Sequence, residues 1–192
     1  MSSHINILRE CLYQESEALK VLADRIDADS IEFAKVISEC KGKIVFTGVG
    51  KSFIVASKIS GTLSSVGISS IPMNPLSILH GDFGFFDYDD IIIVVSNSGE
   101  TRILIDVMNC IRKIDVKILS ITGNKKSTIA SMSNKTIEIE TNEAGPFGLV
   151  PSTSTTAMMA YGDALACLMV ELKGLTLNDF HRNHPSGKLS KF

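Results

Sequence analysis

Apolar residues follow two patterns along this chain. Short runs rich in isoleucine and valine, such as residues 91–95, contain no polar position and predict strands buried on both faces. Between these runs, apolar residues recur every three or four positions, which predicts amphipathic helices. The expected strands are residues 43–47, 68–73, 91–95, 116–122 and 136–140, the last at an edge. The expected helices are residues 4–40 with a break near 27–30, then 51–66, 103–111, 127–132 and 157–172.

The alternation of strands and helices predicts the fold class α/β, with a three-layer αβα architecture. Parallel strands need crossover connections, and right-handed crossovers place helices on both faces of the sheet. Ligands of such folds bind at the carboxyl ends of the strands, near the point where the strand order reverses. The turns that follow residues 47 and 95 are therefore the places to look for chemistry.

The turn after residue 95 is rich in small hydroxyl residues. It reads Ser-Asn-Ser-Gly-Glu-Thr over residues 96–101 and leads directly into a predicted helix. Free N–H groups and the positive end of the helix dipole make such a turn suited to an anion, most often a phosphate. A simple helix cap explains the same residues, since serine and threonine are ordinary N-caps. The turn alone does not separate these two interpretations.

A second turn, Gly-Val-Gly-Lys-Ser at residues 48–52, follows the first predicted strand. A nucleotide P-loop requires glycine at position 45, which is Val45, and a dinucleotide fingerprint requires glycine at position 53, which is Phe53. Both nucleotide motifs are therefore disfavoured. What remains is a tight turn that brings Gly50, Lys51 and Ser52 to the carboxyl edge of the sheet.

A loop of unusual composition precedes the last long helix. Residues 141–156 contain one carboxylate, Glu143, two prolines and five consecutive hydroxyl residues, 152–156. A hydroxyl residue at a helix start is expected for capping, but five in succession exceed that need. We expect this loop to close one side of a polar pocket of about the size of a sugar.

Three histidines have both a structural and a chemical interpretation. His80 lies in an apolar, glycine-rich connector, where a histidine is more often a hydrogen-bonded structural residue than a ligand. His181 and His184 lie three apart in a polar tail, and a zinc site there lacks a third ligand at a sensible spacing. Such a tail can also be frayed. No metal site is expected.

Composition excludes several classes of partner. The 192 residues are 44% hydrophobic and 21% charged with a net charge of −2, so neither nucleic acid nor an anionic membrane is an expected partner. No signal peptide or membrane-spanning run is visible. The four cysteines form no CxxC pair and are expected as reduced thiols of a cytoplasmic protein.

Taken together, the motifs resemble the SIS (sugar isomerase) domain, and more narrowly the arabinose-5-phosphate isomerase family. The resemblance is carried by GVGKS at 48–52, HGDFG at 80–84, SNSGE at 96–100, EAGPFGLVPSTSTT at 143–156, GDALA at 162–166 and HPSGKL at 184–189. It implies a flavodoxin-like five-stranded parallel sheet, a homotetramer with shared active sites, and no cofactor. It also implies the interconversion of D-ribulose 5-phosphate and D-arabinose 5-phosphate for synthesis of the lipopolysaccharide or capsule sugar Kdo.

The resemblance also implies roles for individual residues. The catalytic residues would be Lys51, Glu100, Glu143 and His184: Glu143 as the carbon base, His184 as the acid/base at oxygen or in ring opening, and Lys51 as the fixed positive charge. Glu100 would share the proton shuttle or orient Lys51, and this choice stays open. Phosphate and substrate binding would fall to Gly50, Ser52, His80, Ser96, Asn97, Ser98, Thr101, Ser152, Thr153, Ser154 and Thr155.

The chain departs from the family pattern in several places. Phe53 replaces the usual glycine after GVGKS, Ser186 and Ser190 alter the terminal motif, and the pair of CBS domains found in many members is absent from the sequence. We therefore expect one SIS domain over residues 1–192, with a helical arm over residues 1–41, either natively short or truncated. Two alternatives to the isomerase remain: an SIS isomerase of a hexulose or heptose phosphate, and a non-catalytic sugar-phosphate sensor.

Overall fold

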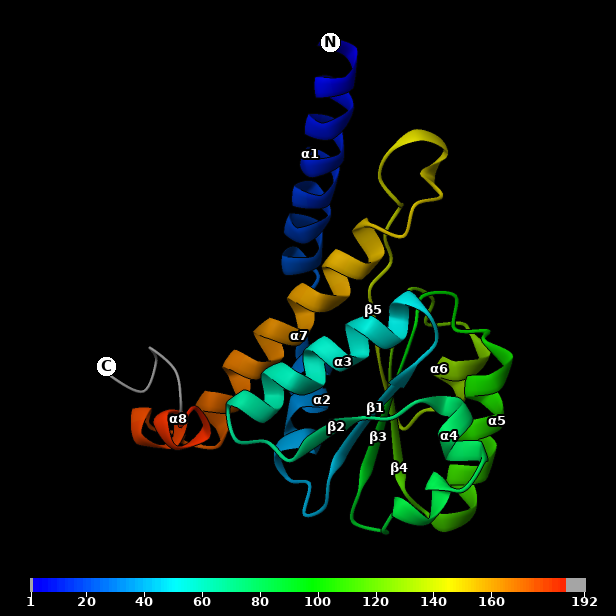
Figure 1. The fold of residues 1–192 in the computed structure, drawn as a ribbon, viewed down its shortest axis with the longest axis vertical. Coiled ribbons are helices and arrows are strands. Elements are labelled where there is room, and N and C mark those ends of the chain that lie inside the picture. The colour runs from blue at the N-terminus through cyan, green and yellow to red at the C-terminus, as the bar shows by residue number, and fades with distance from the viewer. Residues whose placement is uncertain (1, 186–192) are drawn as a thin grey trace.

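The expected strands form one parallel sheet with the order β2-β1-β3-β4-β5. The computed structural model describes residues 2–185 (Figure 1). The strands are β1 (Ile44–Gly48), β2 (Ser70–Pro72), β3 (Ile91–Ser96), β4 (Lys117–Thr122) and β5 (Lys135–Glu138). Each predicted strand is present, and β5 lies at the edge as expected. The strand order reverses between β1 and β3, so the predicted three-layer, flavodoxin-like α/β fold is confirmed.

Helices cover both faces of this sheet. They are α1 (Ser2–Asp24), α2 (Ala28–Ser38), α3 (Lys51–Ser65), α4 (Pro75–Leu79), α5 (Arg102–Ile111), α6 (Thr128–Met132), α7 (Thr153–Leu172) and α8 (Leu177–Asn183). Within the described residues, 3₁₀ turns lie at Asp82–Phe85, Arg112–Ile114 and Pro146–Gly148. The sequence did not predict α4 or α8, which have five and seven residues.

Two apolar clusters, one on each face of the sheet, form the core. Alternate residues of each strand point to opposite faces, so Phe46 and Ile93 pack against α2, α3 and α7, while Val45 and Ile92 pack against α4, α5 and α6. All six residues of β3 are buried. This explains why an unbroken apolar run predicted the central strand correctly.

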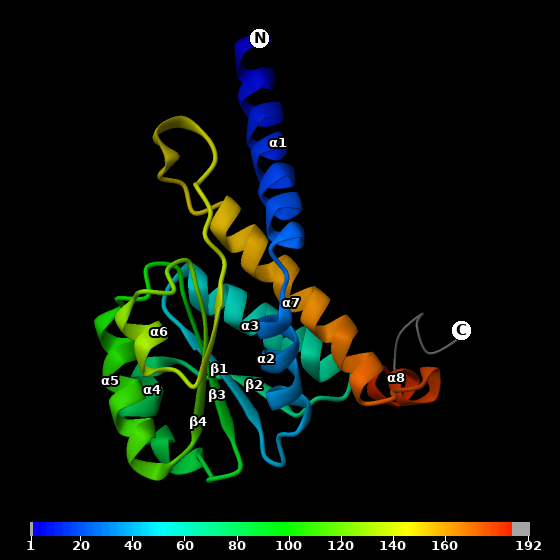
Figure 2. The ribbon, with the colours of Figure 1, turned by 180° about the vertical axis from the view of Figure 1, so that it is seen from behind.

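The helix α1 extends well beyond the rest of the domain (Figure 2). Its 23 residues correspond to about 35 Å of helix, and its inner part packs on α7. The predicted break in the arm is confirmed: Asp27 separates α1 from α2 and caps α2 by accepting bonds from the N–H groups of Asp29 and Ser30. Leu8, Leu12 and Tyr13 on the outer part of α1 are exposed.

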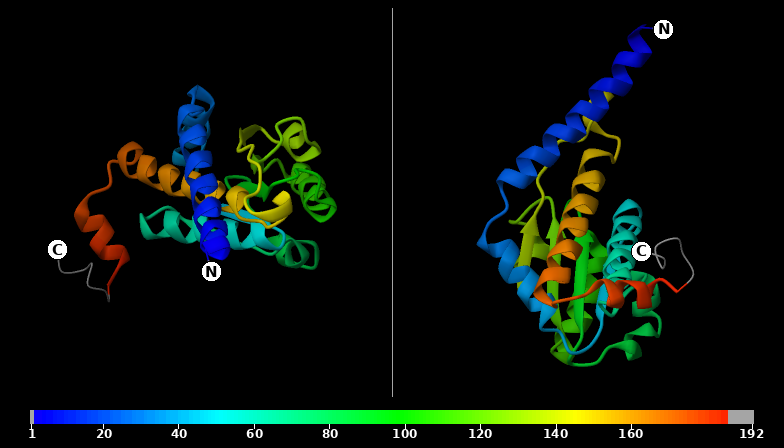
Figure 3. Two further views of the ribbon diagram at one scale, coloured as in Figure 1. Left: turned by 90° about the horizontal axis from the view of Figure 1, so that it is seen from above. Right: turned by 90° about the vertical axis from the view of Figure 1, so that its left-hand side faces the viewer.

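The carboxyl ends of the strands and the start of α7 lie toward the same end of the molecule as α1 (Figure 1). The helix α8 lies elsewhere, beside the C-terminal end of α3 (Figure 3). A capping box between Thr176 and Asp179 starts α8. Among residues 2–185, no helix is both long enough and apolar enough to cross a lipid bilayer.

Candidate active site

The two turns singled out in the sequence lie next to each other at the carboxyl edge of the sheet. Gly48 at the end of β1 is paired in register with Val95 of β3. The segment that contains Gly50, Lys51 and Ser52 follows Gly48, and the hydroxyl-rich turn follows Val95. The structure therefore brings these two predicted groups of residues together, at the point where the strand order reverses.

The helices that leave these two turns differ from most others in how they begin. A side chain caps α2, α4, α6 and α8; the capping residues are Asp27, Asn74, Ser127 and Thr176. Among the described residues, neither Gly50 before α3 nor Thr101 before α5 makes a side-chain capping bond. The two helix N-termini at the strand-order reversal are thus the ones left open to an external acceptor.

The turn after β3 is held by its own hydroxyl groups. The Ser96 hydroxyl is buried, accepts from the N–H of Gly99 at 3.2 Å and lies 3.1 Å from the Thr101 hydroxyl oxygen. The Ser98 hydroxyl accepts from the N–H of Glu100 at 3.2 Å. Asn97 and Ser98 are exposed. The first serine therefore shapes the turn from inside, and the two exposed side chains face solvent, where a ligand can reach them.

Glu100 is exposed and fixed at one point. Its Oε1 accepts a hydrogen bond of 2.8 Å from the main-chain N–H of Thr128, the first residue of α6. This bond lowers the pKa of the Glu100 carboxyl. Glu100 is thus ionised at neutral pH and tied to a neighbouring helix, and no ion pair between it and Lys51 forms within the part of the chain that the structure describes.

Glu143 lies nine residues before Ser152, and its carboxylate caps the N-terminus of α7. Its Oε2 accepts from the N–H groups of Ser152 at 3.0 Å and Ser154 at 3.1 Å, and the Ser154 hydroxyl donates to Oε1. Burial raises the pKa of Glu143, but the hydrogen bonds from Ser154 and Ser152 outweigh burial, so the pKa lies below its ordinary value. The carboxylate is thus preorganised at the positive end of a 20-residue helix.

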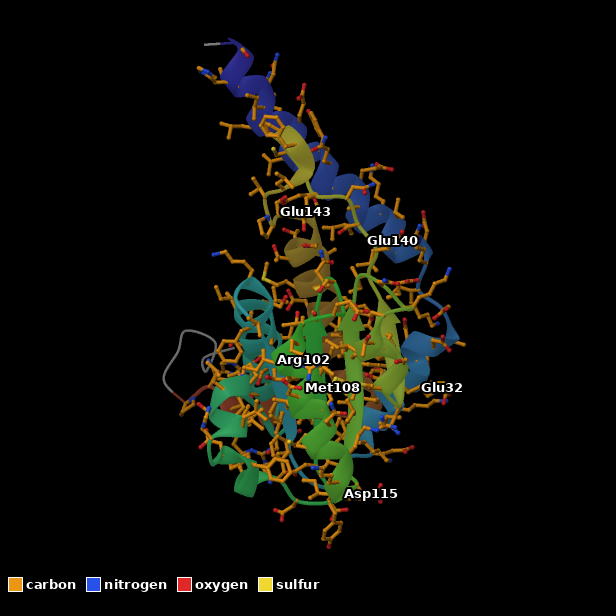
Figure 4. All side chains as sticks on the ribbon, turned by 90° about the vertical axis from the view of Figure 1, so that its right-hand side faces the viewer. Glu32, Arg102, Met108, Asp115, Glu140 and Glu143 are labelled. Atoms are coloured by element: carbon orange, nitrogen blue, oxygen red, sulfur yellow. The ribbon has the colours of Figure 1, made fainter. Side chains whose placement is uncertain are left out.

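A cavity of about 480 Å³ borders Glu143. It lies between α1 and residues 140–143, with Glu140 and Glu143 on the side that faces α1 (Figure 4). Its charged lining consists of Glu17, Arg25, Glu140 and Glu143, and Arg25 pairs with Glu140 at 3.6 Å. The long helical arm therefore forms one wall of the space next to the candidate base.

Within the described part of the chain, neither candidate histidine makes a hydrogen bond or ion pair to these groups. His80 ends α4, is exposed, and its main-chain N–H bonds to the carbonyl oxygen of Ser77. The His184 ring stacks on Phe180 with centroids 4.1 Å apart, and its Nδ1 lies 2.8 Å from the Phe180 carbonyl oxygen. The expected remainder of the terminal motif, residues 186–189, lies outside the described residues.

The distance between His184 and Lys51 is set by the length of α3. Asn183, the residue before His184, bonds through its side chain to the carbonyl oxygen of Ser65, the last residue of α3. Lys51 is the first residue of this 15-residue helix, so the two ends are about 20 Å apart along its axis. Within one chain, the structure does not bring His184 to the two turns.

The sequence did not predict two contacts at or near the candidate carboxylates: the bond from the N–H of Thr128 to Glu100, and the bond from Gly145, two residues after Glu143, to Gln14. Thr128 received no role, and Gln14, whose Oε1 accepts from the N–H of Gly145 at 3.1 Å, was only part of a helical arm. Neither contact has a local sequence signal, because each joins residues far apart in the chain. Thr47 also received no role, whereas Thr153 is one of the expected substrate-binding residues. The hydroxyls of both are buried without a partner in the described part of the chain.

The described residues contain no group of three or more His, Cys, Asp or Glu side chains placed to hold a metal ion.

The SIS domain model matches residues 37–168. Arabinose 5-phosphate isomerase KpsF of Escherichia coli O6:H1 (strain CFT073) is 37% identical over 189 residues, covering 97% of this chain and 58% of that protein. Arabinose 5-phosphate isomerase KdsD of Francisella tularensis is 35% identical over 195 residues, covering 100% of this chain and 60% of that protein.

The chain thus spans about three fifths of the length of these curated relatives. The solved structure of Escherichia coli CFT073 c3406 in complex with arabinose 5-phosphate matches more completely. It has a TM-score of 0.92 and 34% sequence identity, and the match covers 96% of this chain and 98% of that one. The matched family model, these relatives and the parallel sheet with its two open helix N-termini agree, and the chain belongs to the SIS domain family.

Proposed function

We propose that this protein is an aldose–ketose isomerase that interconverts D-arabinose 5-phosphate and D-ribulose 5-phosphate. The single observation that carries the proposal is the pair of uncapped helix N-termini, α3 and α5, next to each other at the strand-order reversal. The named relatives, which are arabinose 5-phosphate isomerases, support the choice of substrate.

The phosphate would bind at these two N-termini. Their N–H groups and helix dipoles favour an anion, and Lys51 in the first turn of α3 adds a full positive charge. Side chains of the two turns would complete the phosphate shell; they are Ser52, Asn97, Ser98 and Thr101. The Ser96 hydroxyl is already engaged inside the turn, where it accepts the N–H of Gly99.

Glu143 would act as the carbon base. It removes the proton from C2 of the open-chain aldose, and the electron pair forms the C1=C2 bond of an enediolate as O1 takes on negative charge. Return of the proton to C1, with transfer of the O2 proton to O1, gives the ketose. Lys51 would stabilise the phosphate or the enediolate, and His184 would move the oxygen protons or open the ring.

The position of His184 supports shared sites between subunits. It lies about 20 Å from Lys51 along α3 in one chain, so a catalytic His184 would act in a neighbouring subunit. Two exposed apolar surfaces support assembly: the outer part of α1, and the loop at Phe147 and Leu149, which are 92% and 77% exposed. A homotetramer is the assembly that we propose.

We place the protein in the cytoplasm and its product in Kdo synthesis, on the basis of the family resemblance. The four cysteines are free thiols, as expected in a reducing compartment. Which polysaccharide the product serves is a property of the organism and not of this site.

A coupled assay with D-arabinose 5-phosphate, following ribulose 5-phosphate, tests the proposal. D-ribose 5-phosphate, glucose 6-phosphate and sedoheptulose 7-phosphate are run beside it. We expect turnover of the arabinose phosphate alone, lost in Glu143→Gln and His184→Ala and retained in Glu171→Gln, an exposed carboxylate on α7. Turnover of a hexose or heptose phosphate would favour another SIS isomerase. Saturable binding without turnover would favour a sensor.

A further inference from the structure

The two oxygens of the Glu143 carboxylate are held differently. Oε2 accepts the N–H groups of Ser152 and Ser154, at 3.0 and 3.1 Å, and lies 3.5 Å from the Ser152 hydroxyl oxygen. Oε1 accepts only the hydroxyl of Ser154 among the described residues. A carboxylate oxygen has two lone pairs, so Oε2 is saturated and Oε1 keeps one lone pair available.

This asymmetry selects the oxygen that can receive a proton. A base needs a lone pair directed at the substrate, and only Oε1 has one. The Ser154 hydroxyl fixes the second lone pair of the same oxygen and so fixes the direction of the first. Ser154 is 2% exposed, so water cannot readily replace its hydroxyl in this contact.

We propose that Ser154 is a positioning residue that orients Oε1 of Glu143 as the proton acceptor. The proposal rests on the proposed isomerase function and deepens it. It also changes the role expected of Ser154 from the sequence: a hydroxyl has one proton to donate, and here the proton goes to Glu143 rather than to a phosphate.

Other charged groups face Glu143 and have to be separated from it in any pH measurement. The cavity beside it is lined by Glu17 of α1, by Arg25 directly after this helix, and by Glu140. Arg25 pairs with Glu140 at 3.6 Å, and Glu17 pairs with Lys20 at 3.2 Å. These pairs are unchanged by a substitution at position 154, so a difference between Ser154 variants reports on Glu143.

The test is the pH dependence of kcat and KM for D-arabinose 5-phosphate in Ser154→Ala, Ser154→Thr and a control, Thr156→Ala, on the same turn of α7. Loss of a hydrogen bond to a carboxylate raises its pKa, so the acid limb of kcat should move up by about one pH unit in Ser154→Ala. The plateau value of kcat should fall, whereas KM should stay within about twofold of the wild-type value, because the substitution removes the orientation of the base and not substrate binding.

Ser154→Thr keeps the hydroxyl, so the acid limb of its kcat profile should return to the wild-type pH. The acid limb of Thr156→Ala should also lie at the wild-type pH. An unchanged limb in Ser154→Ala, or the same shift in Thr156→Ala, would overturn the proposal. If the alanine variant does not fold, Ser154→Cys keeps the side-chain volume with a weaker donor, and the same upward shift is expected.

A second measurement separates this proposal from the proposed function. The Glu143 carboxyl carbon is followed by ¹³C NMR titration without substrate and assigned by its loss in Glu143→Gln. A higher pKa in Ser154→Ala than in wild type supports the contact whatever the enzyme acts on. Absence of turnover in wild type would defeat the function alone, whereas identical titration of both proteins would defeat the positioning role alone.

Discussion

Gly48 at the end of β1 leaves no room for a side chain beside Ser52 in the first turn of α3: a Cβ built on Gly48 would be 2.8 Å from the carbonyl carbon of Ser52 and 2.9 Å from its oxygen. The same residue is paired with Val95 of β3. Gly48 therefore holds the N-terminus of α3 close to the sheet and beside the turn that leads to α5. Any side chain at this position would push the two open helix ends apart.

Gly48→Ala should accordingly lower the free energy of unfolding by about 1–3 kcal/mol through overpacking and raise KM for the sugar phosphate. The control is Gly61→Ala, inside α3, where a Cβ meets nothing within 4 Å; there alanine should stabilise by about 0.5–1 kcal/mol. Denaturant unfolding and steady-state kinetics measure both effects. Equal KM for Gly48→Ala and wild type would contradict the role of the α3 N-terminus in phosphate binding.

The cap that Glu143 provides for α7 should give stability that depends on pH. Its pKa is lowered in the folded state, so this contribution is complete above the unfolded pKa of about 4.3 and is lost as pH falls through the folded value. Glu143→Gln should cost about 1 kcal/mol at neutral pH, and the cost should shrink in acid. Thermal unfolding of the two proteins from pH 7 to pH 3 measures the difference. A constant difference would argue against the cap.

At the amino ends of the strands, Asp90, directly before β3, contacts Lys43, directly before β1. Its buried carboxylate accepts from the N–H of Lys43 at 2.7 Å and pairs with the Lys43 ammonium at 2.9 Å. Asp90→Ala should cost about 3 kcal/mol because it breaks a buried charge pair. Asp89→Ala, which removes an adjacent exposed carboxylate, should stay within about 0.5 kcal/mol of wild type. Urea unfolding compares the two, and equal losses would refute the assignment.

The separation of His184 from Lys51 gives a prediction about mixed oligomers. Lys51→Ala and His184→Ala should each be inactive. When the two variants are unfolded together and refolded, some assemblies will combine an intact Lys51 turn of one chain with an intact His184 of another. Activity should then return. No recovery, with mixed assemblies demonstrated by mass spectrometry, would mean that both residues are needed in the same chain.

The strands were predictable because burial on both faces requires unbroken apolar runs, as in residues 91–95. The helix α8 was not, because a capping box between Thr176 and Asp179, and not a long apolar period, starts it. Sequence motifs placed Glu143 and Ser154 in one loop and assigned the hydroxyl to phosphate. The contact between them depends on how a loop folds back onto a helix end, which no periodicity encodes.

The most direct test of the central claim follows the C2 proton of D-arabinose 5-phosphate by ¹H NMR in D₂O. An enediolate mechanism with Glu143 as base predicts loss of this proton as solvent deuterium enters C1 or C2, in the wild type and in Glu171→Gln. Glu143→Gln should slow the loss by about 10²–10⁴-fold. Retention of the C2 proton with the wild-type protein, or unchanged exchange in Glu143→Gln, would contradict the account.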